Sequence, residues 1–139
     1  MQIRTCFLAL SGCLFFSACA DQIVDSCGEV AGNGGLKARF SSIQQYILTP
    51  RCATAGCHAG SQPPENMSLE AGMSYNNLVN TASNQSVLLR VKPGSSMESW
   101  LIRKLEGDGT TRMPLTGQQL SLAEIDTIRM WIDLGAIND

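Results

Sequence analysis

The sequence has few aromatic residues, little net charge and a single histidine, and each shortage excludes something. Aromatic residues make up 6% of the 139 residues, so the core must depend on aliphatic and methionine side chains. The formal net charge is -2, whereas nucleic-acid binding needs a concentrated basic face. We therefore expect no nucleic-acid partner. Because His58 is the only histidine, two histidines of one chain cannot bind the same metal ion here.

The N-terminal apolar run is too short to cross a bilayer, which takes ~20 residues. A short basic start, residues 1–4, precedes this run of residues 5–16, and small residues then lead to Cys19. This order is typical of a secretory signal peptide, and the residues before Cys19 resemble the lipobox of bacterial lipoproteins. We expect a signal peptide over residues 1–18 and lipidation of Cys19. The lipid would anchor the protein to a membrane on the periplasmic side of the cell envelope.

Two alternatives to lipidation at Cys19 remain open. The residues before Cys13 fit the lipobox spelling better, but cleavage there would leave only residues 6–10 as the hydrophobic core of the signal. The other alternative is an ordinary cleaved signal with an unmodified cysteine nearby. Ala20 stands where an inner-membrane retention signal would have Asp. This favours the outer membrane as the site of the anchor.

Three cysteines remain after the anchor: Cys27, Cys52 and Cys57. An odd number is awkward for a disulfide framework in an oxidising compartment. Residues 19–36 contain several glycines and no apolar periodicity, which predicts a flexible spacer. Cys27 falls in this spacer and has no assigned role. Residues 37–139 are predicted to form one domain.

An amphipathic helix is expected at the start of the domain. Phe40, Ile43 and Ile47 recur at the spacing of one helix face. The helix should stop before Pro50, because the residue that precedes a proline avoids helical backbone angles. Residues 51–64 are then expected to form a loop.

A second amphipathic helix is expected at the C-terminal end. Ser121 and Glu124 have the spacing of a capping box, in which each side chain accepts a hydrogen bond from a free backbone N–H. The apolar face behind this box consists of Leu122, Ile125, Ile128 and Ile132. Gly135 suits the end of the helix.

The middle of the domain is predicted to be mainly helical and irregular. We expect a helix over residues 69–79 and either a strand or an extended segment over residues 87–91. Ser95 and Glu98 have the spacing of a further capping box, and Gly107 suits the end of the helix that would follow. The predicted fold class is therefore all-α.

One short motif carries the chemistry. Cys-x-x-Cys-His is the attachment motif for a c-type haem, whose vinyl groups take the two thiols while the histidine binds the iron. Cys52, Cys57 and His58 follow this order, but four residues separate the cysteines instead of two. The extra pair must loop out. The residues between are small, and Gly56 can adopt backbone angles that other residues avoid.

A haem iron with six ligands needs a second axial ligand, and methionine sulfur is the candidate. The domain contains Met67, Met73, Met97, Met113 and Met130. We predict Met113, because it falls in an irregular segment that could bring the thioether over the haem and because Pro114 limits how that segment moves. The alternative is that Met113 only fills space in the core.

The chain resembles the bacterial class I-type cytochrome c domains of the Cys-x4-Cys-His variety. The matching stretches are residues 51–60, 100–105, 112–115 and 128–136. The resemblance implies one covalent haem c held by Cys52 and Cys57, with His58 and Met113 as axial ligands. It also implies a cytochrome c-like fold, with the first and last helices packed together and Trp131 beside the haem. The function implied is electron transfer between redox protein partners, not enzyme catalysis.

Three other interpretations compete with this one. If Met113 does not bind the iron, an open site could serve a haem sensor or a peroxidase-like enzyme. Without haem, a disulfide between Cys52 and Cys57 would leave an interaction lipoprotein. A zinc site from Cys27, Cys52, Cys57 and His58 is disfavoured, because structural zinc usually takes its ligands from two separated pairs.

Overall fold

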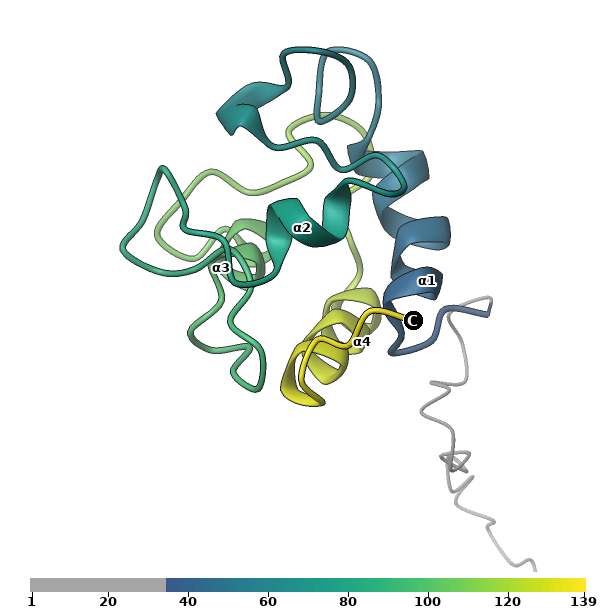
Figure 1. Ribbon diagram of the computed structural model, residues 1–139, viewed down its shortest axis with the longest axis vertical. Coiled ribbons are helices and arrows are strands. Elements are labelled where there is room, and N and C mark those ends of the chain that lie inside the picture. Colours follow the sequence, from purple (N-terminus) through teal and green to yellow (C-terminus); the bar gives the residue numbers. More distant parts are fainter. Residues whose placement is uncertain (1–34) are drawn as a thin grey trace, which may run out of the picture.

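A computed structural model of the protein describes residues 35–139. The predicted signal peptide, Cys13, Cys19, Cys27 and almost all of the spacer lie outside the described residues. Within residues 35–139 the chain is rich in helix and contains no strand (Figure 1). None of the helices in this part is long and apolar enough to cross a membrane.

The first helix is longer than the sequence indicates. The α-helix α1, Phe40–Ile43, continues directly into the π-helical segment η1, Gln44–Cys52, so the prediction that the helix stops before Pro50 is wrong. Hydrogen bonds in this wider turn span five residues, as the 2.7 Å bond from the Ala53 N–H to the Leu48 carbonyl does. The missing N–H of proline removes one such bond without ending the turn. Cys52 therefore ends a helix instead of standing in a loop.

The middle of the domain contains less helix than predicted. After the short 3-10 turn η2, Pro64–Asn66, the helix expected over residues 69–79 is reduced to α2, Ser74–Leu78. Gly72 has a φ of +84°, in the left-handed region, and this interrupts any earlier helical turn. Residues 87–91 form no strand, and only isolated bridges pair them with their neighbours.

The helix α3, Trp100–Glu106, begins later than its predicted capping box. Ser99 is the residue before its first turn and makes no side-chain cap, so the prediction of a box formed by Ser95 and Glu98 is wrong. The Glu98 carboxylate binds the Lys92 ammonium group at 2.6 Å and the Ser95 hydroxyl at 3.1 Å instead. Gly107 ends α3 in the left-handed conformation with a φ of +79°, as predicted.

The last helix, α4, Leu122–Asp133, has the capping box that the sequence predicts. The Ser121 hydroxyl accepts the Glu124 N–H at 3.3 Å, and the Glu124 carboxylate accepts the Ser121 N–H at 2.7 Å. Ile125, Ile128 and Ile132 are buried as expected. Leu122 is 75% exposed, because it is the first residue of the helix and precedes the stretch that contacts the core.

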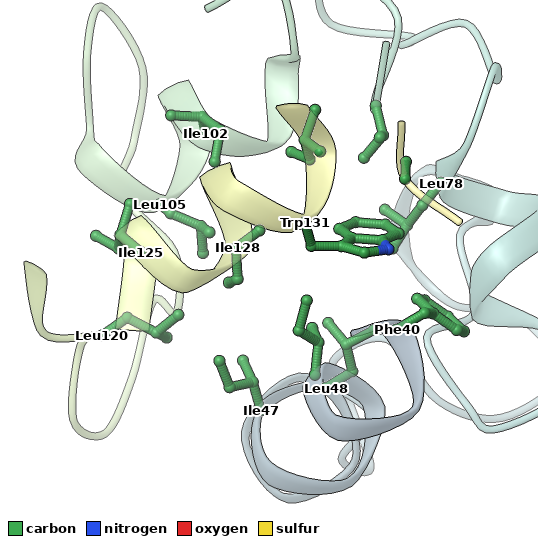
Figure 2. Packing of buried hydrophobic residues seen from close by; sticks show 14 of the residues in the cluster. Phe40, Ile47, Leu48, Leu78, Ile102, Leu105, Leu120, Ile125, Ile128 and Trp131 are labelled. Carbon is green, nitrogen blue, oxygen red and sulfur yellow. The ribbon is translucent and has the colours of Figure 1, made fainter. Parts of the chain in front are cut away.

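The first and last helices pack together at the centre of the core. α1 and α4 lie side by side in Figure 1, and the rings of Phe40 and Trp131 are 5.5 Å apart. In Figure 2, Ile47 and Leu48 point from the first helix toward Ile128 on the last. The helix that ends at Cys52 is thus fixed against α4 by aliphatic and aromatic packing.

The two Ser-x-x-Glu motifs give a matched test of this fold. Replacement of Ser121 by alanine removes a real N-cap and should lower the free energy of unfolding by about 1 kcal/mol. The same replacement at Ser95 should leave the urea midpoint nearly unchanged, because Ser95 caps no helix. Urea unfolding followed by circular dichroism makes the comparison. Equal losses at both positions would contradict the helix boundaries described above.

Candidate functional site

A cavity of about 570 Å³ opens beside the C-terminal end of η1. Small-molecule and cofactor sites occupy ~300–1,000 Å³. All four residues predicted from the sequence line this one cavity: Cys52, Cys57, His58 and Met113. Buried apolar side chains form much of its wall, among them Ile47, Leu105, Ile128 and Trp131. The structure thus brings together residues that are up to 61 positions apart in the sequence.

The segment between the cysteines folds back on itself. The His58 N–H donates to the Cys52 carbonyl at 3.0 Å, and the Cys57 N–H donates to the Thr54 carbonyl at 2.9 Å. Gly56 has a φ of +79°, which glycine adopts without strain. The four intervening residues therefore loop out and return Cys57 and His58 to the cavity beside Cys52.

Both cysteines at this site are free, half-buried thiols. Burial raises the pKa of the Cys52 thiol to about 11, although the positive charge of Arg51 opposes this rise and the neighbouring Cys57 adds to it. The thiol of Cys52 is therefore protonated at neutral pH.

The ring of His58 is held in one tautomer. Its Nδ1 lies 3.1 Å from the Met67 carbonyl oxygen, which can only accept, so Nδ1 carries the proton. The Nε2 lone pair is left for a metal ion. Burial is the main cause that lowers the pKa of His58, which favours the neutral imidazole that metal binding requires. The adjacent backbone is fixed by the Leu69 N–H, which donates to the His58 carbonyl at 2.8 Å.

Met113 lies near the middle of the segment between α3 and α4, residues 107–121. Its N–H donates to the Lys104 carbonyl at 2.7 Å, and this bond ties it to the last turn of α3. The Arg112 guanidinium donates to the Leu105 carbonyl at 2.8 Å and to the Leu120 carbonyl at 3.0 Å. These hydrogen bonds hold the chain at Met113 and at Leu120, while the Met113 side chain lines the cavity.

Met67 is the other methionine at the cavity. Because its carbonyl accepts the His58 Nδ1 proton, the Met67 backbone lies beside the His58 ring. This position disfavours it as a ligand opposite that ring. Met73 and Met97 are 54% and 81% exposed, and Met130 does not line the cavity. Met113 is thus the best-placed candidate for a ligand opposite His58.

The sequence offers Arg90, together with Lys92, Arg103, Lys104 and Arg112, as a possible partner of haem carboxylates or of an acidic protein, but it favours scattered surface charge for most of these cations. Arg90, however, is only 7% exposed and lines the cavity. Its guanidinium donates to the carbonyls of Asn77 and Glu65 at 2.8 and 2.9 Å. Among the described residues no carboxylate forms an ion pair with it. In the sequence Arg90 stands inside the apolar run of residues 87–91, and this place could have indicated that its side chain is buried.

Residues 35–139 contain no group of three or more His, Cys, Asp and Glu side chains that could hold a metal ion. Cys27, which the zinc interpretation requires, lies outside this range.

Comparisons with protein-family models, with curated proteins and with solved structures each find no match to this chain.

Proposed function

We propose that this protein is a monohaem c-type cytochrome that transfers single electrons outside the cytoplasm. The observation that carries the proposal is the convergence of Cys52, Cys57, His58 and Met113 on one cavity. Two thiols, one neutral imidazole and one thioether form the donor set that this cofactor uses. The proposal places the protein on the periplasmic side of the cell envelope, with a lipid on Cys19 as its anchor, preferably in the outer membrane.

The residues present fit a haem in three respects. The cavity volume of about 570 Å³ is within the range of cofactor sites, and its wall is largely apolar. The only histidine there, His58, is held with Nε2 free. Arg90 is a buried cation that is influenced by the charge of Glu65 but forms no direct ion pair in the described part of the chain, and a haem carries two carboxylate groups. A buried charge of this kind is costly unless an anionic group pairs with it.

Each residue then has a definite task. Cys52 and Cys57 would hold the cofactor covalently, and His58 Nε2 and the Met113 sulfur would be the axial ligands. A haem bound in this way supplies a one-electron change at its iron. The neutral, soft thioether of Met113 favours the reduced iron and so raises the reduction potential. Ile128 and Trp131, which are buried in the cavity wall, would exclude water from the cofactor.

This ligand set argues for a carrier rather than an enzyme, because two axial protein ligands leave no position for a substrate. Redox proteins would then be the partners, as electron donor and acceptor. The test is stoichiometric titration of the purified protein with a small one-electron mediator, followed by addition of hydrogen peroxide to the reduced form. We expect one electron per chain and slow, non-catalytic reaction with peroxide. Sustained peroxide turnover would favour the open-site alternative.

A further inference from the structure

The segment that follows Met113 has very few attachments of its own. Residues 115–119 are all exposed. Among the residues that the structure describes, the one hydrogen bond to residues 114–119 comes from Arg51, whose guanidinium donates to the Gln118 carbonyl at 2.8 Å. We call residues 113–120 the Met113 loop. Its two ends are held by α3 and by Arg112, but its middle depends on Arg51.

Arg51 is itself firmly held. Its other terminal nitrogen forms an ion pair with Glu124 Oε1 at 2.5 Å, and both side chains are mostly buried, with 20% and 24% exposed. The second oxygen of Glu124 belongs to the capping box of α4, where it accepts the Ser121 N–H. The Arg51 guanidinium is therefore fixed to the start of α4 while its second nitrogen holds Gln118. A planar guanidinium can serve two acceptors in this way, and a lysine ammonium on a flexible stem cannot reproduce that geometry.

Arg51 also links this loop to the cysteine motif. It directly precedes Cys52 at the end of η1 and lines the same cavity. One side chain thus connects the helix end that carries Cys52 with the middle of the loop that begins at Met113. Relative motion of these two segments would change the distance between the two sides of the cavity.

We propose that Arg51 is a positioning residue that holds the Met113 loop closed over the cavity, so that Met113 stays in place and external ligands stay out. This inference rests on the proposed function, since Met113 is taken as the axial ligand. Arg51 touches neither the iron nor any substrate in this account and acts only through the Gln118 carbonyl. Loss of that contact would let the loop open, and the cavity would then admit a small ligand.

The experiment compares Arg51→Met and Arg51→Lys with a matched control, Arg129→Met. Arg129 forms an ion pair with Glu106 between α3 and α4, and neither residue lines the cavity. Imidazole is mixed with each oxidised, haem-loaded full-length protein, and the rate of its binding is followed by visible absorption. We expect Arg51→Met to bind imidazole on the order of tenfold faster, the equivalent of one charge-assisted hydrogen bond. Arg129→Met should behave as wild type.

The lysine variant separates positioning from charge. It keeps the positive charge beside Cys52 but loses the planar guanidinium that serves both acceptors. We therefore expect imidazole to bind at a rate close to that of Arg51→Met. Wild-type behaviour of Arg51→Lys would show that only charge matters and would overturn the inference. An equal increase in Arg129→Met would do the same, because it would indicate general loosening of the fold.

A second measurement needs no bound haem. Chymotrypsin can cut after Leu115, which is 67% exposed in the Met113 loop. At temperatures equally far below each melting point, both Arg51 variants should be cut there several-fold faster than wild type and Arg129→Met. Equal cutting in all four proteins would overturn the inference. A wild-type protein that carries no haem would instead refute the proposed function, and the cutting rates would still decide the role of Arg51.

Discussion

Replacement of both Cys52 and Cys57 by serine is expected to abolish covalent haem in protein that is expressed together with haem-maturation machinery. A thiol adds to a haem vinyl group to form a thioether, and a serine hydroxyl is too weak a nucleophile to do so. On a denaturing gel the wild-type band should keep its haem colour and the double variant should lose it completely. The intact mass should fall by one haem beyond the change caused by the two substitutions.

The matched control for this experiment is Cys27→Ser, which also removes a thiol but lies in the predicted spacer. This variant should keep its full complement of covalent haem. Each single variant, at Cys52 or at Cys57, should retain at most one thioether bond and bind haem less securely. Covalent haem in the double variant would contradict the assignment of these two cysteines, and loss of haem in Cys27→Ser would show that the attachment site was misplaced.

The second large effect is expected for Met113→Ala. Removal of the thioether should open one axial position, so that external imidazole binds roughly 100-fold more tightly, the equivalent of about 2.7 kcal/mol. The weak sulfur-to-iron absorption band at the red end of the oxidised spectrum should disappear. The reduction potential should fall, because the soft sulfur no longer favours the reduced iron.

Met67→Ala is the control that the cavity itself offers. Met67 lines the same cavity, but its backbone lies beside the His58 ring. This variant should keep the sulfur-to-iron band and the low affinity for imidazole. If Met67→Ala lost the band and Met113→Ala kept it, the axial ligand would be Met67. If neither variant changed the spectrum, no methionine at this cavity would be a ligand.

The sequence predicted those features of the fold that depend on short-range chemistry. The capping box of Ser121 and Glu124 needs only residues three apart, and it forms as expected. The same pattern at Ser95 fails, because the Glu98 carboxylate is bound by Lys92, whose position depends on the turn of residues 92–95. The spacing of serine and glutamate alone therefore could not distinguish a pattern that forms a helix cap from one that does not.

The candidate site shows the same limit. Cys52, Cys57 and His58 could be recognised because they are close together in the sequence. The sequence predicts a stop before Pro50, because the residue that precedes a proline usually avoids helical backbone angles. The chain nevertheless continues through Pro50 as a π-helical turn. Arg90 could not be separated from the other candidate cations, because its burial depends on contacts with the carbonyls of Asn77 and Glu65, and no local pattern encodes them.

The most direct test of the proposed function is a single preparation of the full-length protein, made with haem-maturation machinery and examined by visible absorption and intact mass. We expect a sharp α-band after reduction with dithionite and a mass that is larger than that of the processed polypeptide by one haem. A colourless protein of unmodified mass, with Cys52 and Cys57 joined as a disulfide, would contradict it.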